Sequence, residues 1–185
     1  MKKLILTIII LFNTLIYSQE KNKILSYMNM SSFSLTKNTE SYFNSYTENN
    51  QKETNGASFE INTIHGIKLF EFIALSGGIS IDWNINKTFL SNPFIVDLRV
   101  FSNKSNKPGF FAYIQTGKNI KWSDSFDGNG TTSKLGIGFI FVENNKTLLY
   151  IDAFKKSKQI QTSEFQHKGY YNTDGFGLSL GIIFK

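Results

Sequence analysis

The sequence predicts an all-β protein, specifically an eight-stranded antiparallel up-and-down barrel that crosses a membrane. Apolar and small residues alternate with period two along most of the 185-residue chain, as in strands whose two faces meet different surroundings. The expected strands are about 9 to 13 residues long, close to the length that a tilted strand needs to cross a bilayer. Long and short connections alternate between them, as in barrels with short turns on one side of the membrane and longer loops on the other.

The composition excludes several other classes of protein. Aromatic residues make up 15% of the chain and charged residues 18%, whereas disordered chains are aromatic-poor and charge-rich. The absence of cysteine excludes a disulfide framework, a thiolate metal site and a cysteine nucleophile. The net charge of +6 is spread along a chain with a single arginine, so we expect no nucleic-acid partner.

The first 18 residues are expected to form a secretory signal peptide. Lys2 and Lys3 precede an apolar run from Leu4 to Phe12, and Ser18 suits the position before the cleaved bond. The alternative is a membrane anchor, but the apolar stretch is shorter than the roughly 20 residues that span a bilayer as a helix. We therefore expect an exported protein whose residues 19–185 form one barrel domain.

The eight strands are expected in order along this domain, each identified by its alternation. The weakest pattern is the first, at 24–35, and the clearest is the last, where Phe176, Leu178, Leu180, Ile182 and Phe184 share one face and glycines dominate the other. The six strands between them are expected at 57–69, 72–83, 94–101, 110–120, 135–141 and 147–159. The long connections are then 36–56, 84–92, 121–133 and 162–174, and the short ones lie near 70–71, 103–108 and 143–146.

Alternation alone does not decide which face points outward. A soluble lipocalin-like barrel would enclose an apolar ligand and present long charged side chains to water. Here the positions opposite the apolar ones are largely glycine, serine, alanine and asparagine, which suit the crowded interior of a small barrel. We therefore expect Leu178, Leu180 and Ile182 to face lipid.

Three segments resemble the small outer-membrane β-barrel proteins of the OmpA and OmpX type. Residues 62–79 are similar to the second and third strands of such barrels with their tight turn, and Pro93 to Arg99 is similar to the fourth. Residues 177–184 resemble the aromatic-ended strand that the outer-membrane assembly machinery recognises, although Lys185 follows Phe184 here. The resemblance covers 24–185 and implies a location in the cell outer membrane of a Gram-negative bacterium. The even number of expected strands places both ends of the barrel on the periplasmic side.

Charged residues on the expected inner face form a candidate site. An unpaired charge in the barrel interior would be costly, so we expect these side chains to pair with one another and to fill the lumen structurally, with Arg99 binding two carboxylates through its planar guanidinium. The alternative is an ion path. The five residues are Glu60, Lys68, Asp97, Arg99 and Asp152.

We expect no catalytic residues, no metal and no cofactor. A lipid-modifying enzyme of the same fold would need a nucleophile, a base and an acid in contact, and His65 with Thr63 on the same face lacks the acid. The segment from Asp124 to Gly130 has some features of a calcium loop but not its ligand spacing, and Asp-Gly and Asn-Gly are first of all turn formers.

The function expected from these observations is that of a non-enzymatic integral membrane protein acting through its outer loops and in envelope integrity. Lys155, Lys156 and Lys158 are candidates for contact with lipopolysaccharide phosphates, the alternative being a solvated strand end. The expected partners are outer-membrane lipid, lipopolysaccharide and the assembly machinery, and the barrel is expected to be a monomer. The alternatives are a lipid-modifying enzyme of the same fold and a soluble periplasmic carrier of an apolar ligand.

Overall fold

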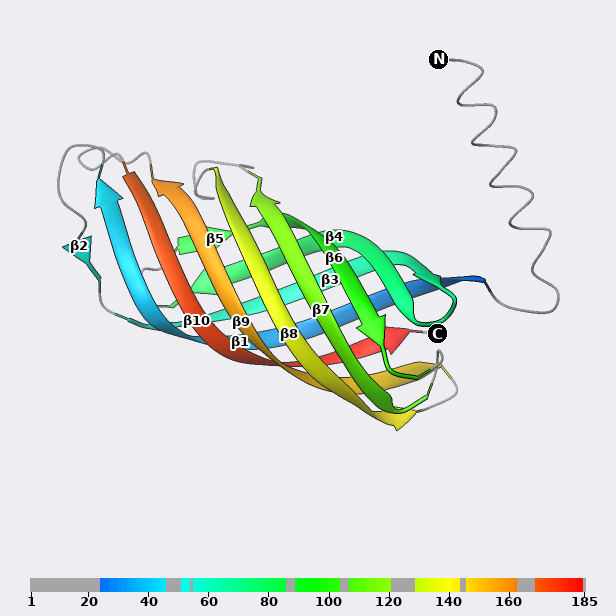
Figure 1. The fold of residues 1–185 in the computed structure, drawn as a ribbon. Helices are drawn as coiled ribbons and strands as arrows, with labels where there is room; N and C mark the ends of the chain where they lie inside the picture. Colours follow the sequence, from blue (N-terminus) through cyan, green and yellow to red (C-terminus); the bar gives the residue numbers. More distant parts are fainter. Residues whose placement is uncertain are drawn as a thin grey trace, which may run out of the picture.

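The chain forms a closed antiparallel β-barrel in a computed structural model (Figure 1). The structure describes residues 24–45, 51–53, 55–85, 89–103, 107–120, 129–143, 146–162 and 169–184. The expected signal peptide and the calcium-like residues 124–128 lie outside these ranges, as do Lys185 and His167. Within them, no helix is long and apolar enough to span a membrane.

Eight long strands make the wall of the barrel, and each pairs antiparallel with its neighbours. The last strand pairs with the first along almost its whole length, which closes the sheet. The expectation of an eight-stranded up-and-down barrel is therefore confirmed. Two short strands, β2 (Gln51–Lys52) and β5 (Phe89–Ser91), pair with β1 and β4. The long strands are β1 (Leu25–Ser45), β3 (Ala57–Leu69), β4 (Ile73–Asn84), β6 (Pro93–Phe101), β7 (Gly109–Asn119), β8 (Gly130–Glu143), β9 (Thr147–Thr162) and β10 (Gly169–Phe184).

The two ends of the barrel differ in their connections. The turns after β3, β6 and β8 are short and lie at the end where β1 starts and β10 finishes (Figure 1); we call this the turn end. Phe70 and Glu71 have φ angles of 49° and 65° there, which gives β3 and β4 a tight reversal. The connections after β1, β4, β7 and β9 lie at the opposite end, which we call the loop end. The connection after β9 covers six residues and is no longer than the turn after β6, which covers seven.

The outward face of the barrel carries a band of apolar side chains, which is interrupted on β1 and β3 by Asn29, Ser31, Thr63 and His65. On β10, Leu178, Leu180 and Ile182 are 59%, 58% and 36% exposed. Each of the remaining long strands also contributes exposed apolar residues at alternate positions. The sequence predicted this orientation, and the structure confirms it. A wall of this kind is stable in hydrocarbon because a closed sheet satisfies all its backbone hydrogen bonds internally.

Aromatic side chains and glycines fit together inside the barrel near the turn end. Tyr150 on β9 lies against Gly181 on β10, and Phe111 on β7 lies against Gly138 on β8. A Cβ atom at either glycine would collide with the neighbouring ring. These contacts explain why the inward face of these strands carries glycine where the outward face carries leucine and phenylalanine.

The strands at the loop end are longer than the sequence predicted. Residues 36–56 were expected to form a loop, but β1 continues to Ser45 with a bulge between Asn38 and Glu40, and it stays paired with β10 throughout. The strands β8, β9 and β10 also extend further toward the loop end than expected. Beyond the apolar band a strand needs only its ladder of backbone hydrogen bonds, so the hydrophobic alternation that marks it in the sequence is lost.

Candidate functional site in the lumen and on the outer wall

Five charged side chains meet inside the barrel toward the loop end, and we call them the ion cluster. The ammonium group of Lys156 lies against the carboxylates of both Glu60 and Asp82. Lys134 Nζ is 2.8 Å from Glu60 Oε1, and Lys158 Nζ is 3.0 Å from Asp82 Oδ2. All five side chains are at most 6% exposed. Three cations and two carboxylates therefore form one connected network.

The strand register explains why this cluster needs contacts across the lumen. Glu60 on β3 is directly opposite Asp82 on β4, and Lys134 on β8 is directly opposite Lys156 on β9. Like charges at paired positions repel one another. The two acidic strands face the two basic strands across the barrel, so that each repulsion is offset by attraction to the other side.

Arg99 differs from the expectation that it would join two carboxylates. Its Nε and Nη2 atoms donate to Asp97 Oδ1 and Oδ2 at 3.3 and 3.1 Å, so both arms bind a single partner on the same strand. The rings of Tyr113 and Phe111 lie 4.3 and 4.7 Å from the guanidinium carbon. Asp97 lies two residues from Arg99 on the same strand, close enough for its carboxylate to accept both hydrogen bonds. The aromatic rings surround the rest of the guanidinium group. Among the described residues, Lys156 rather than Arg99 links two carboxylates.

The other expected lumen charges are buried but do not join Arg99. The carboxylate of Asp152 accepts a hydrogen bond from the Tyr113 hydroxyl at 2.9 Å. Lys68 Nζ lies 4.1 Å from the centre of the Phe101 ring. Glu60 belongs to the ion cluster described above. The structure therefore distributes the five expected residues over several contacts instead of one network.

Four members of the ion cluster were not among the expected lumen residues. Asp82 shares the inward parity of Ala74 and Ser80 on β4, and Lys134 shares that of Gly136 on β8. Lys156 and Lys158 share the parity of Asp152 on β9. Extending the period-two pattern to the ends of these strands would have identified all four.

The three lysines expected to contact lipopolysaccharide lie on different faces of β9. Lys156 and Lys158 point inward and are buried against Glu60 and Asp82. For these two the expectation of an external contact is wrong, because alternate residues of a strand point to opposite faces. Lys155 lies between the inward-pointing Phe154 and Lys156, so its own side chain points outward and is exposed on the outer wall.

His65 lies on the outer wall, as its parity predicts. Its Nδ1 atom is 2.6 Å from the Tyr27 hydroxyl, and Thr63 accepts a hydrogen bond from Ser31 at 3.2 Å. The partner of the imidazole is thus a phenol, where a hydrolytic triad places a carboxylate. Within the described ranges, no three His, Cys, Asp or Glu side chains are grouped closely enough to hold a metal ion.

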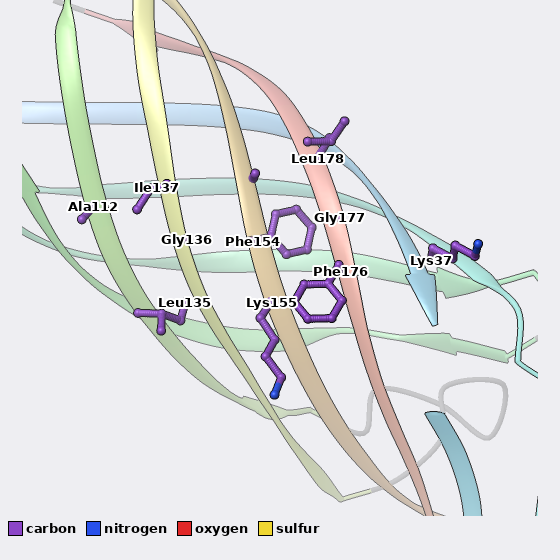
Figure 2. Close-up of a pocket in the computed structure, with 11 residues that line it drawn as sticks. Lys37, Ala112, Leu135, Gly136, Ile137, Phe154, Lys155, Phe176, Gly177 and Leu178 are labelled. Atoms are coloured by element: carbon purple, nitrogen blue, oxygen red, sulfur yellow. The ribbon is translucent and has the colours of Figure 1, made fainter. Parts of the chain in front are cut away.

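A shallow groove crosses the outer wall over β7 to β10, about midway along β8, β9 and β10 (Figure 2). Its volume is about 690 Å³. Ala112 and Ala153 are the small outward residues in it, and Leu135, Ile137, Phe176 and Leu178 stand around them. Lys37 and Lys155 line it at the side of the loop end. The groove is therefore apolar with two basic residues at one edge.

A closed eight-stranded barrel with an apolar outer band and buried charges in its lumen has the architecture of a transmembrane β-barrel. Comparison with solved structures gives the same fold. The crystal structure of Neisserial surface protein A (NspA) aligns with a TM-score of 0.57 and 12% identity, over 87% of this chain and 98% of that one. The outer membrane protein OprG from Pseudomonas aeruginosa aligns with a TM-score of 0.48 and 7% identity, over 85% and 94%.

The likeness to NspA shows the fold of a small outer-membrane β-barrel. No protein-family model matches the sequence. No curated protein matches it either.

Proposed function

We propose that this chain is an integral outer-membrane protein without enzymatic activity, whose lumen is closed and whose loop end faces the cell exterior. The observation that carries the proposal is the apolar band on the outward face of a closed barrel, bounded at the loop end by strands with polar outward residues such as Lys37, Ser133 and Lys155. Short turns on the periplasmic side and longer loops outside are the usual arrangement in such barrels.

The buried side chains support a structural lumen over a transport path. Toward the turn end it is filled by a cluster that includes Met28, Ile64, Phe111 and Tyr150, and toward the loop end by the ion cluster. An eight-stranded barrel has an interior just wide enough for side chains. We therefore infer that the charges in the lumen hold the strands together and that the protein acts through its external surface.

The external surface is suited to contacts with lipopolysaccharide, other surfaces or partner proteins. β1, β9 and β10 continue beyond the apolar band and carry polar residues such as Glu40, Ser157 and Asn172 on their outward side. Functional residues are often presented by loops on a rigid scaffold. We propose that these contacts contribute to the integrity of the envelope, and that β10 is the strand used by the assembly machinery.

The orientation is tested by cysteine labelling, because the native chain contains no cysteine. Gln51→Cys places a thiol at the loop end and Lys146→Cys places one at the turn end, and both positions are exposed. A membrane-impermeant maleimide should label the first variant in intact cells and the second only after the outer membrane is broken. Labelling of the second variant in intact cells would reverse the proposed orientation.

The closed lumen is tested by conductance in planar bilayers. The purified barrel should give no sustained ion current, whereas a stable open channel would contradict a structural lumen. Loss of the protein from its host should increase sensitivity to detergents, and expression of the wild-type chain should restore resistance. An unchanged sensitivity would remove the role in envelope integrity.

A further inference from the structure

The outer wall carries two exposed lysines in one row with a single aromatic residue between them. Lys37 on β1 is paired with Phe176 on β10, and Phe176 is paired with Lys155 on β9. Figure 2 shows Lys155 and Lys37 on opposite sides of Phe176. Since neighbouring strands are about 4.8 Å apart, the two lysine backbones are separated by about 10 Å.

This row marks the edge of the apolar band. On the side of the turn end, the next outward residues are Leu35, Leu178 and Ala153, which are aligned in register. On the side of the loop end, the next outward residues of β9 and β10 are Ser157 and Asp174. The two lysines therefore lie at the height where the headgroups of the outer leaflet meet the hydrocarbon.

The groove lies directly on the hydrocarbon side of this row. Ala153 and Ala112 stand beside Ile137 in the register of β9, β8 and β7, and their small side chains leave Ile137 and Leu178 unusually prominent, at 69% and 59% exposed. A depression between prominent side chains matches the shape of acyl chains lying along the wall.

We propose that this surface is a binding site for a multiply acylated glycolipid with two phosphates, of the lipid A type. This inference rests on the proposed outer-membrane orientation. The acyl chains occupy the groove over Ala112 and Ala153, and the phosphates lie near the ammonium groups of Lys37 and Lys155. Two basic groups on either side of one ring favour a lipid with two separated anionic groups over one with a single phosphate.

Asp174 limits where the phosphates lie. It is paired with Ser157 and is two residues beyond Phe176 on the outward face of β10. A carboxylate there repels phosphate, so the phosphates lie on its membrane side, at the level of the lysines. Asp174→Asn should therefore strengthen binding.

The test uses the purified full-length barrel and native mass spectrometry. The probes are bis-phosphorylated hexa-acyl lipid A, phosphatidylglycerol and inorganic phosphate. The wild-type barrel should retain lipid A in preference to phosphatidylglycerol, and inorganic phosphate should not displace the bound lipid A. A basic residue near an anionic lipid surface contributes about a fivefold change in binding, so Lys37→Gln/Lys155→Gln should lose about 25-fold.

The matched control is Lys52→Gln/Lys118→Gln, which removes the same charge from exposed lysines toward the loop end that do not line the groove. It should bind lipid A as the wild type does. Ala153→Phe should weaken lipid A binding with both lysines intact, because it fills the groove from the outer wall. This position is exposed, so the barrel should still fold.

Three results would overturn the inference: equal binding by the Lys37/Lys155 variant and the control, equal retention of phosphatidylglycerol, or displacement by inorganic phosphate. Cysteine labelling separates this failure from that of the proposed function. If Gln51→Cys is labelled on intact cells and lipid A does not bind, only the lipid site is wrong. If Lys146→Cys is labelled instead, the orientation fails and the lipid site fails with it.

Discussion

The ion cluster predicts a large loss of stability when Glu60 is replaced by glutamine. Glu60 binds Lys134 at 2.8 Å and Lys156 at 2.5 Å, and it is 3% exposed. In the Glu60→Gln variant, Lys134 loses its carboxylate partner, and Lys156 and Lys158 keep only Asp82. Removing one partner of a buried ion pair costs about 3–5 kcal/mol. Glutamine keeps the shape of the side chain and one carbonyl acceptor, so we expect the loss in the free energy of unfolding to be about 3 kcal/mol.

The measurement is urea unfolding of the barrel in lipid vesicles, monitored through the fluorescence of its tryptophan residues. The control is Glu40→Gln, the same substitution at an exposed position of β1, which should change the free energy of unfolding by less than about 0.5 kcal/mol. If Glu60→Gln behaves as this control does, the ion cluster does not stabilise the barrel.

A double variant tests whether the cost comes from an unpaired cation. Glu60→Gln/Lys134→Met removes both partners of one pair and leaves Asp82 with Lys156 and Lys158. It should be more stable than the sum of the two single changes predicts, with a coupling of about 1–3 kcal/mol. Simple additivity would refute the explanation by charge pairing.

Three further predictions follow from other parts of the barrel. Arg99→Ala leaves Asp97 buried without its partner, which should cost about 3–5 kcal/mol of stability. The midpoint temperature of heat unfolding, measured by the gel mobility of samples heated to increasing temperatures, should therefore fall. An unchanged midpoint would show that the pair is not stabilising. Gly181→Val places a side chain against the Tyr150 ring. The free energy of unfolding, measured with urea, should therefore fall by about 1–3 kcal/mol, the cost of an overpacked interior. Leu180→Arg places a charge in the apolar band and should cost about 2–4 kcal/mol in a bilayer, whereas a wild-type folding yield in vesicles would contradict the lipid-facing assignment.

The fold was predictable because its signal is local. Each residue of a strand points to one face or the other, and a wall between lipid and a narrow lumen demands different side chains on those faces. The alternation around Leu178 and Leu180 therefore identified both the strand and its outward face. The same rule, extended to Lys156 and Lys158, contained the information that these lysines point inward.

The ends of the strands were less predictable for the opposite reason. From Asn38 to Ser45, β1 keeps its pairing with β10, yet polar side chains lie on both its inward and its outward face. Backbone hydrogen bonds hold such a segment without constraining its sequence pattern. Residues expected to form a loop therefore belong to a strand.

The sequence by itself determined the strand number, the face that meets lipid and the presence of buried charges. Only the tertiary structure decided which charges meet, because the partners of Lys156 come from β3 and β4, across the barrel from β9. Closure, tilt and register together set the height of each side chain in the lumen, and none of these is written in one strand alone. For the same reason Lys37 and Lys155, which lie far apart in the chain, become neighbours in one row only when β10 pairs with β1.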